Sequence, residues 1–216
     1  MPLGFYLGHL ITAAIVLVAV IGAVRWRRLD QGGRWLVAAV AVSAAFVPFS
    51  LWLVFAGRSN RLLNEGSMFF ETVLLIVALA SWQPSPSRRR VVWWIAAVFA
   101  GAWVAAQWIQ GWGAEFSYLS FPVAGLVKVG AAGYTLLGGV QSTDGRWTDH
   151  LWFWATSGIM VIYGTEVILA PLWAQVFGVR NDLALAAFAV NTVGNVSGYL
   201  LIARGLWRLQ PVPEVS

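Results

Sequence analysis

Seven long apolar segments constrain the fold of this chain more than any other feature of its sequence. A helix that crosses a lipid bilayer needs about 20 mostly apolar residues. Because lipid offers no hydrogen bonds to the backbone, a spanning segment of this length forms a helix. The sequence predicts such helices at about residues 4–24, 35–56, 67–82, 91–112, 118–140, 150–177 and 182–207, and the third is short for a span.

The composition supports a membrane domain. Hydrophobic residues make up 59% of the chain and charged residues only 11%, whereas a soluble domain carries about a quarter charged residues. The sequence has no cysteine, which excludes disulfides and cysteine-ligated metals. We therefore expect an all-α fold, a polytopic bundle of seven transmembrane helices that forms a single domain over residues 1–216.

Arginines are distributed unequally between the connecting segments. Lys and Arg concentrate in the cytoplasmic loops of membrane proteins, so we expect the N-terminus outside and the C-terminus in the cytoplasm. The first segment has no basic residue before it and four soon after it, the reverse of a cleaved signal peptide. The predicted outer side has Arg58, Arg61 and Arg180. The predicted cytoplasmic side has Arg25, Arg27, Arg28, Arg34, Arg88, Arg89, Arg90, Arg146, Arg204 and Arg208.

The excess of basic over acidic residues, 14 against 9, is explained by this topology. No nucleic-acid partner is therefore expected, and the lipid bilayer is the first partner. Two arginine clusters have two interpretations: they fix topology and touch anionic lipid, or they contact a membrane or cytoplasmic protein. The clusters are Arg25, Arg27 and Arg28, and Arg88, Arg89 and Arg90.

Several polar residues fall inside the predicted helices, where they are rare and usually face the bundle interior. Lys128 lies ten residues into its helix, roughly 15 Å from the outer end. Glu71 is expected close to the outer end of the short third helix. A charged lysine in hydrocarbon is costly, so we expect Lys128 to pair with Glu166 or Glu71, or to be deprotonated. The candidate site comprises Lys128, Glu166, Glu71, Asn191, Asn195 and His9.

Two interpretations of these residues stay open. Most of them lie in the predicted outer half, with Lys128 and Asn191 deepest, which indicates a polar cavity near the outside. Alternatively, Lys128 and a glutamate form a structural ion pair, and Asn191 and Asn195 only bond between helices. The asparagines are four residues apart and therefore share one helix face.

Most enzyme chemistry is disfavoured. The two histidines, His9 and His150, belong to opposite sides of the membrane, so neither a three-histidine zinc site nor a bis-histidine haem can form. The sequence has no H-E-x-x-H, G-x-S-x-G or phosphate-binding glycine loop. We expect no catalytic residues, no metal and no cofactor.

Residues 51–60, "LWLVFAGRSN", align without gaps to residues 172–181, "LWAQVFGVRN". Leu, Trp, Gly and Asn match at the same offsets, which is compatible with two parallel three-helix halves and a linking fourth helix. Parallel repeats occur in transporters. This 3+1+3 arrangement resembles the sugar-exporting and PQ-loop transporters, although their Pro-Gln motif is absent.

Two further resemblances are with heptahelical proteins. A buried lysine and an external N-terminus resemble microbial rhodopsins, but retinal is not expected because the predicted last helix has no lysine. Residues 153–173, "FWATSGIMVIYGTEVILAPLW", and residues 191–206, "NTVGNVSGYLLIARGL", resemble a group of uncharacterised bacterial heptahelical membrane proteins. Residues 69–82, "FFETVLLIVALASW", fit the same pattern. This resemblance implies a multi-pass protein of a bacterial inner membrane.

The sequence favours recognition of a small ligand or a membrane partner through the outer polar cavity, as a sensor or an accessory subunit. A small transporter with two three-helix halves is the alternative. It predicts that polar residues continue to the inner face, and few are evident. The second alternative is a structural subunit of a larger membrane complex, in which the tryptophan-rich fourth helix packs against another chain.

Overall fold

A computed structural model of the protein describes residues 3–110, 120–176 and 181–208. Within these ranges the chain forms seven α-helices, as the sequence predicts, two short 3₁₀ turns and no strand. The turns are Trp26–Arg28, after α1, and Trp147–Asp149, before α6. The helices are α1 (Leu3–Arg25), α2 (Gln31–Phe55), α3 (Arg61–Ser81), α4 (Pro86–Gln110), α5 (Ser120–Ser142), α6 (Leu151–Val176) and α7 (Asn181–Trp207).

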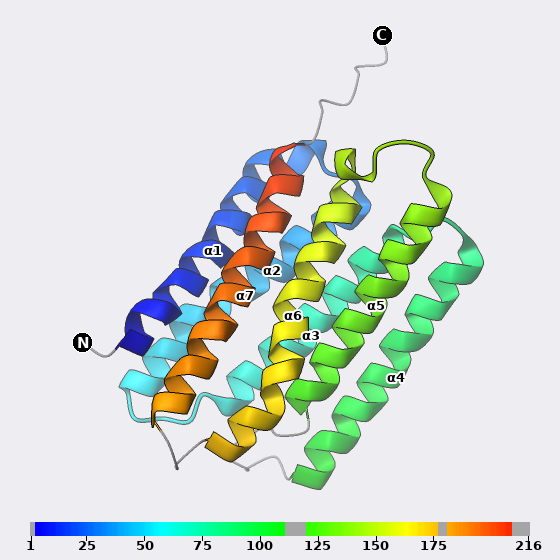
Figure 1. Ribbon diagram of the computed structural model, residues 1–216. Helices are drawn as coiled ribbons and strands as arrows, with labels where there is room; N and C mark the ends of the chain where they lie inside the picture. Colours follow the sequence, from blue (N-terminus) through cyan, green and yellow to red (C-terminus); the bar gives the residue numbers. More distant parts are fainter. Residues whose placement is uncertain (1–2, 111–119, 177–180, 209–216) are drawn as a thin grey trace.

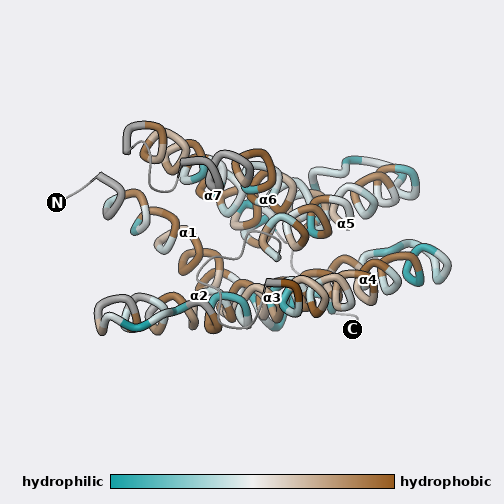
Figure 2. Tube along the Cα trace, turned by 90° about the horizontal axis from the view of Figure 1, so that it is seen from below, coloured by the Kyte–Doolittle hydropathy of each residue, from teal (hydrophilic) through white to brown (hydrophobic). Residues whose placement is uncertain are grey.

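The helices form an antiparallel bundle in which each one packs against its neighbours in the chain (Figure 1). The ring closes because α7 packs against α1. In Figure 2 the bundle has two rows, α2, α3 and α4 in one and α5, α6 and α7 in the other, with α1 at one side. Helix α3 also packs against α5, so these two helices join the rows.

Within the described residues, six helices are long and apolar enough to cross a membrane. In α2 the apolar stretch found within the described side chains, Gln31–Val47, is shorter than a span. Large apolar side chains cover the outside of the bundle, among them Trp94 and Trp108 of α4, which are 71% and 80% exposed. By length and composition, the chain is a multi-pass helical membrane protein.

The structure corrects the predicted start of α3. The helix begins at Arg61, six residues before the predicted residue 67, and is 21 residues long, so it is not short for a span. Asn60 and Asn64 look like loop residues in the sequence, but both bond to Ser50 of α2, at 2.7 and 3.0 Å. Because a neighbouring helix satisfies these polar side chains, α3 begins directly after Asn60 and includes Asn64.

Helices α2 and α4 also begin earlier than predicted. At α2, the Asp30 carboxylate accepts a hydrogen bond from the Gly33 N–H at 2.6 Å, which caps the first turn. At α4, Pro86 occupies the first position, where proline is tolerated because that N–H has no intrahelical partner. The predicted end of the fourth helix at residue 112, the start of the fifth at 118 and the end of the sixth at 177 lie outside the described residues.

The ten arginines of the predicted cytoplasmic side lie at one end of the bundle, where α1, α3, α5 and α7 finish. Arg58 and Arg61 lie at the opposite end, and Arg180 is outside the described residues. Helix α1 begins and α7 ends at opposite ends of the bundle (Figure 1). The helical packing therefore separates the two sets of arginines that the sequence distinguishes.

Helices α6 and α7 form the most extensive interface in the described part of the bundle. Gly158 and Gly198 face each other there, and a Cβ added at Gly198 would lie 2.6 Å from the Gly158 carbonyl oxygen and overlap Ile162. A Cβ added at Gly194 would likewise overlap the side chain of Thr165. Small residues let helix backbones approach closely in lipid, where dispersion contacts replace the hydrophobic effect.

We predict that Gly198→Ala separates α6 from α7 and lowers the free energy of unfolding by about 1–3 kcal/mol, as overpacking does. Thermal unfolding of the purified protein in detergent measures this effect. Gly164→Ala, on α6, is the matched control, because a Cβ at position 164 has no neighbour within 4 Å. A Gly164→Ala variant as unstable as Gly198→Ala would contradict the role assigned to the close contact.

Candidate functional site

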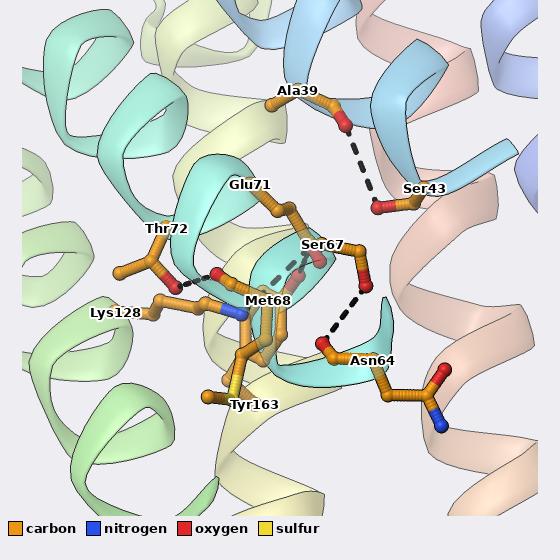
Figure 3. Close-up of polar contacts among 9 residues, drawn as sticks. All are labelled: Ala39, Ser43, Asn64, Ser67, Met68, Glu71, Thr72, Lys128 and Tyr163. Atoms are coloured by element: carbon orange, nitrogen blue, oxygen red, sulfur yellow. Dashed lines mark hydrogen bonds and ion pairs between the residues drawn. The ribbon is translucent and has the colours of Figure 1, made fainter. Parts of the chain in front are cut away.

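Lys128 is the centre of the candidate site. It lies on the inward face of α5 and is only 3% exposed. Its Nζ is 3.8 Å from Oε1 of Glu71 on α3. The same Nζ lies 3.8 Å from the ring centroid of Tyr163 on α6, a cation–π distance. Figure 3 shows the lysine pointing toward Glu71 and Tyr163.

Tyr163 completes this contact, because its hydroxyl donates a hydrogen bond to the same Glu71 oxygen that faces Lys128. The tyrosine is 5% exposed. Its ring therefore faces the ammonium while its hydroxyl binds the carboxylate. Three helices, α3, α5 and α6, meet at this group of three side chains.

A second carboxylate lies beside the first. Glu166 follows Tyr163 by three residues, so it lies on the same side of α6. It interacts electrostatically with both Lys128 and Glu71, and it has a hydrogen bond with the side chain of Asn195 on α7. The two carboxylates therefore lie within electrostatic reach of one ammonium.

Asn195 links this group to Asn191. The Asn195 Nδ2 donates to the Asn191 backbone oxygen at 3.0 Å and to Asn191 Oδ1 at 3.2 Å. Asn195 is 5% exposed. The two asparagines therefore form one polar face of α7, as their spacing of four predicts.

The structure brings together five of the six residues predicted for the site. Lys128, Glu71, Glu166, Asn191 and Asn195 form a connected group, which with Tyr163 we name the Lys128 cluster. The choice between Glu71 and Glu166, open in the sequence, is resolved: the ion pair is with Glu71. His9 lies instead at an exposed position on α1, a helix that packs against α2 and α7.

The predicted depth of Glu71 was wrong. Because α3 begins at Arg61, Glu71 is ten residues from either end of the helix, roughly 15 Å from each. It therefore lies near the middle of the bundle, at a depth where an ion pair with Lys128 is needed to offset the cost of burying a charge. It does not lie in a shallow position near the headgroups.

Sequence reasoning missed another carboxylate, Glu65, which is buried and only 3% exposed. Its two oxygens accept hydrogen bonds of 2.7 Å, one from Gln107 Nε2 of α4 and one from Ser120 Oγ of α5. The sequence placed Glu65 in a loop because the start of α3 was set too late. Its spacing from the buried residues Met68 and Thr72, at i+3 and i+7, is the helical signal that identifies it.

A third polar contact lies toward the basic end of the bundle. Gln83 is 5% exposed and donates from Nε2 to Thr135 Oγ1 of α5 at 2.7 Å. Its Oε1 has no hydrogen-bond partner within the described residues. Ser120, Lys128 and Thr135 are eight and seven residues apart, so polar side chains lie at three depths along one buried face of α5.

The predicted partner surface at residues 88–90 is partly occupied within the chain itself. Arg88 donates to Gln141 Oε1 at 3.0 Å, and its guanidinium stacks over the Tyr134 ring at 4.7 Å. Arg89 Nε donates to the Ala80 carbonyl oxygen at 3.2 Å. Arg88 and Arg89 therefore tie α4 to α5 and to the end of α3.

No family model, curated protein or solved structure matches this chain. Among the described residues, no group of three histidine or acidic side chains is placed to hold a metal ion. What the cluster offers chemically is a protonatable amine, two carboxylates, a tyrosine and two amides in the interior of a membrane protein. Side chains of these types are able to bind ions and hydrogen-bonding ligands and to exchange protons.

We predict that Lys128→Met lowers the free energy of unfolding by about 3–5 kcal/mol, because it leaves buried carboxylates without their cation. The double variant Lys128→Met/Glu71→Gln should recover part of this loss, because it also removes the carboxylate that Lys128 contacts. Unfolding of the wild type, both single variants and the double variant in detergent gives the coupling free energy. Strictly additive effects would contradict a direct Lys128–Glu71 interaction.

Proposed function

We propose that the protein is a seven-span protein of a bacterial inner membrane that recognises a small ligand through the Lys128 cluster. Its N-terminus lies outside and its C-terminus in the cytoplasm. The ten arginines at one end of the bundle support this orientation by the positive-inside rule. The resemblance to bacterial heptahelical proteins supports the choice of membrane.

The observation that carries this proposal is the imbalance of charge in the cluster. A structural ion pair requires one carboxylate for Lys128, and Glu71 provides it at 3.8 Å. Glu166 is a second carboxylate within electrostatic reach of the same ammonium. Inside a membrane protein a carboxylate is costly unless it has its own cation or hydrogen bonds to both oxygens, as Glu65 has. We infer that Glu166, which has no cation of its own, holds a positive species that is not part of the chain.

The ligand class follows from this imbalance. A proton or a small cation at Glu166 balances the second carboxylate, and Asn195, already bonded to Glu166, offers an amide oxygen to the same species. Glu65 does not serve this purpose, because both its oxygens already accept hydrogen bonds near the outer end of α3. Entry is proposed from the outer end, from which α3, α5 and α7 begin.

We predict that a small cation raises the thermal stability of the purified protein, because a ligand that binds only the folded state stabilises it. Sodium, potassium, methylammonium and choline chlorides are compared at constant ionic strength. Glu166→Gln should abolish the shift, whereas Glu65→Gln, which alters a carboxylate outside the cluster, should retain it.

The opposite pattern would reject this assignment. Stabilisation by anions such as acetate or nitrate, varied with a common cation, would indicate that Lys128 and not Glu166 meets the ligand. An equal response to every cation in the Glu166→Gln variant would place the binding elsewhere.

A transporter is the second candidate, and the polar face of α5 favours it. The sequence suggested few polar residues beyond the midplane, but Gln83 and Thr135 are buried and bonded between the Lys128 cluster and the basic end. Glu65 and Ser120 form a further polar contact at the outer end of the same interface. Polar side chains therefore occur along most of the α3–α5 interface. A path across the membrane needs this distribution, whereas a one-sided binding site does not.

Cation flux into proteoliposomes separates the two candidates. For a transporter, we predict that Gln83→Leu reduces cation flux at least about tenfold, because it removes a hydrogen-bonding side chain from the path, and one such interaction is worth about 1 kcal/mol or more. The cation-induced thermal shift should persist in this variant. Ser81→Ala, two residues earlier at the last position of α3, is the control. A protein that shows the thermal shift but no flux in the wild type would be a binder only.

A further inference from the structure

A groove between α1 and α2 lies at the basic end of the bundle, apart from the Lys128 cluster. Its volume is about 710 Å³. The helices meet where Gly22 approaches Val37: a Cβ at Gly22 would lie 2.7 Å from Val37 Cγ1. Beside this contact the walls are made of small apolar residues, which leave room between the helices. They are Ala19, Ala23, Val24, Val37, Ala38 and Ala41.

The groove ends at the 3₁₀ turn that follows α1, where Trp26, Arg27 and Arg28 line it. All three side chains are exposed. Within the described part of the chain, neither Arg27 nor Arg28 has a side-chain hydrogen bond or ion pair. Other arginines at this end do have partners: Arg25, for example, stacks on the Trp207 ring at 5.2 Å. Two cations therefore lie at the end of the groove without a negative partner.

We propose that this groove binds one acyl chain of an anionic phospholipid, with its phosphate at Arg27 and Arg28. An apolar groove on the outside of a membrane-spanning bundle faces lipid tails, and basic pockets at the cytoplasmic ends of such helices bind anionic headgroups. Trp26 lies where tryptophan prefers to be, at the level of the headgroups. The helix of a partner protein would fill the apolar part but leave the two arginines unmatched.

The geometry assigns separate roles to the two parts of the site. The arginines select the headgroup, because a phosphate accepts hydrogen bonds from two guanidinium groups and, in an anionic headgroup, no ammonium group of the same lipid repels them or offsets its charge. The alanines admit the chain, because a larger side chain on the groove wall occupies the space of the methylene groups. A headgroup variant and a groove-filling variant should therefore fail in different ways.

The test uses native mass spectrometry of the whole protein in mixed micelles with phosphatidylglycerol or phosphatidylcholine that carry the same acyl chains. We expect the wild type to retain phosphatidylglycerol preferentially. Arg27→Gln/Arg28→Gln should reduce that retention about tenfold or more, to the level of phosphatidylcholine. Ala41→Leu, at an exposed position on the groove wall, should reduce retention of both lipids.

Matched controls distinguish this site from general surface effects. Arg90→Gln/Arg146→Gln removes the same charge at the same end of the bundle, and Ala97→Leu adds the same side chain at an exposed position of α4; both should bind lipid as the wild type does. Equal losses in these controls would overturn the proposal. So would equal retention of the two lipids by the wild type, or displacement of phosphatidylglycerol by inorganic phosphate alone, which would show that the groove does not hold an acyl chain.

Discussion

The structure depends on one constraint: a lysine ammonium in the middle of a membrane bundle must find its partners within the protein. Lys128 meets a carboxylate of α3 and an aromatic ring of α6, so the rotations of three helices are fixed together. The close α6–α7 contact at Gly194 and Thr165 brings α7 alongside Glu166, and Asn195 bonds to that carboxylate. Packing of small residues and pairing of charges thus support the same arrangement.

Much of this arrangement could be predicted from the sequence. Apolar segments separated by arginines and prolines identify all seven helices, and rare polar residues inside them identify most of the Lys128 cluster. The partner of Lys128 could not be predicted, because it depends on helix rotation. Glu65 was missed for another reason: Asn60 and Asn64 resemble loop residues, and only Ser50 on another helix explains why α3 includes Asn64. Tyr163 has no distinguishing signal, because tyrosine is common near membrane interfaces.

Polar side chains along α5 have consequences beyond stability. Ser120, Lys128 and Thr135 face α3 at three depths, and each contacts a polar side chain on it or directly after it. In the contacts at the two ends, a neutral side chain donates the hydrogen bond: Ser120 to Glu65, and Gln83 to Thr135. Such hydrogen bonds hold neighbouring helices together. The middle contact differs because it contains a cation, Lys128, with one carboxylate at ion-pair distance and a second within its electrostatic reach. The function that we propose therefore lies in the middle of the bundle, and the contacts at its ends pair α3 with α5.

The central claim is that Glu166 holds a positive species that the chain does not provide. Infrared difference spectroscopy of the purified protein, recorded as the stabilising cation replaces a proton, tests it most directly. The account predicts loss of a protonated-carboxyl band, together with gain of a carboxylate band, and both should be absent in Glu166→Gln. A spectrum without carboxyl changes, or one unchanged by Glu166→Gln, would contradict it and leave the Lys128 cluster as a structural network.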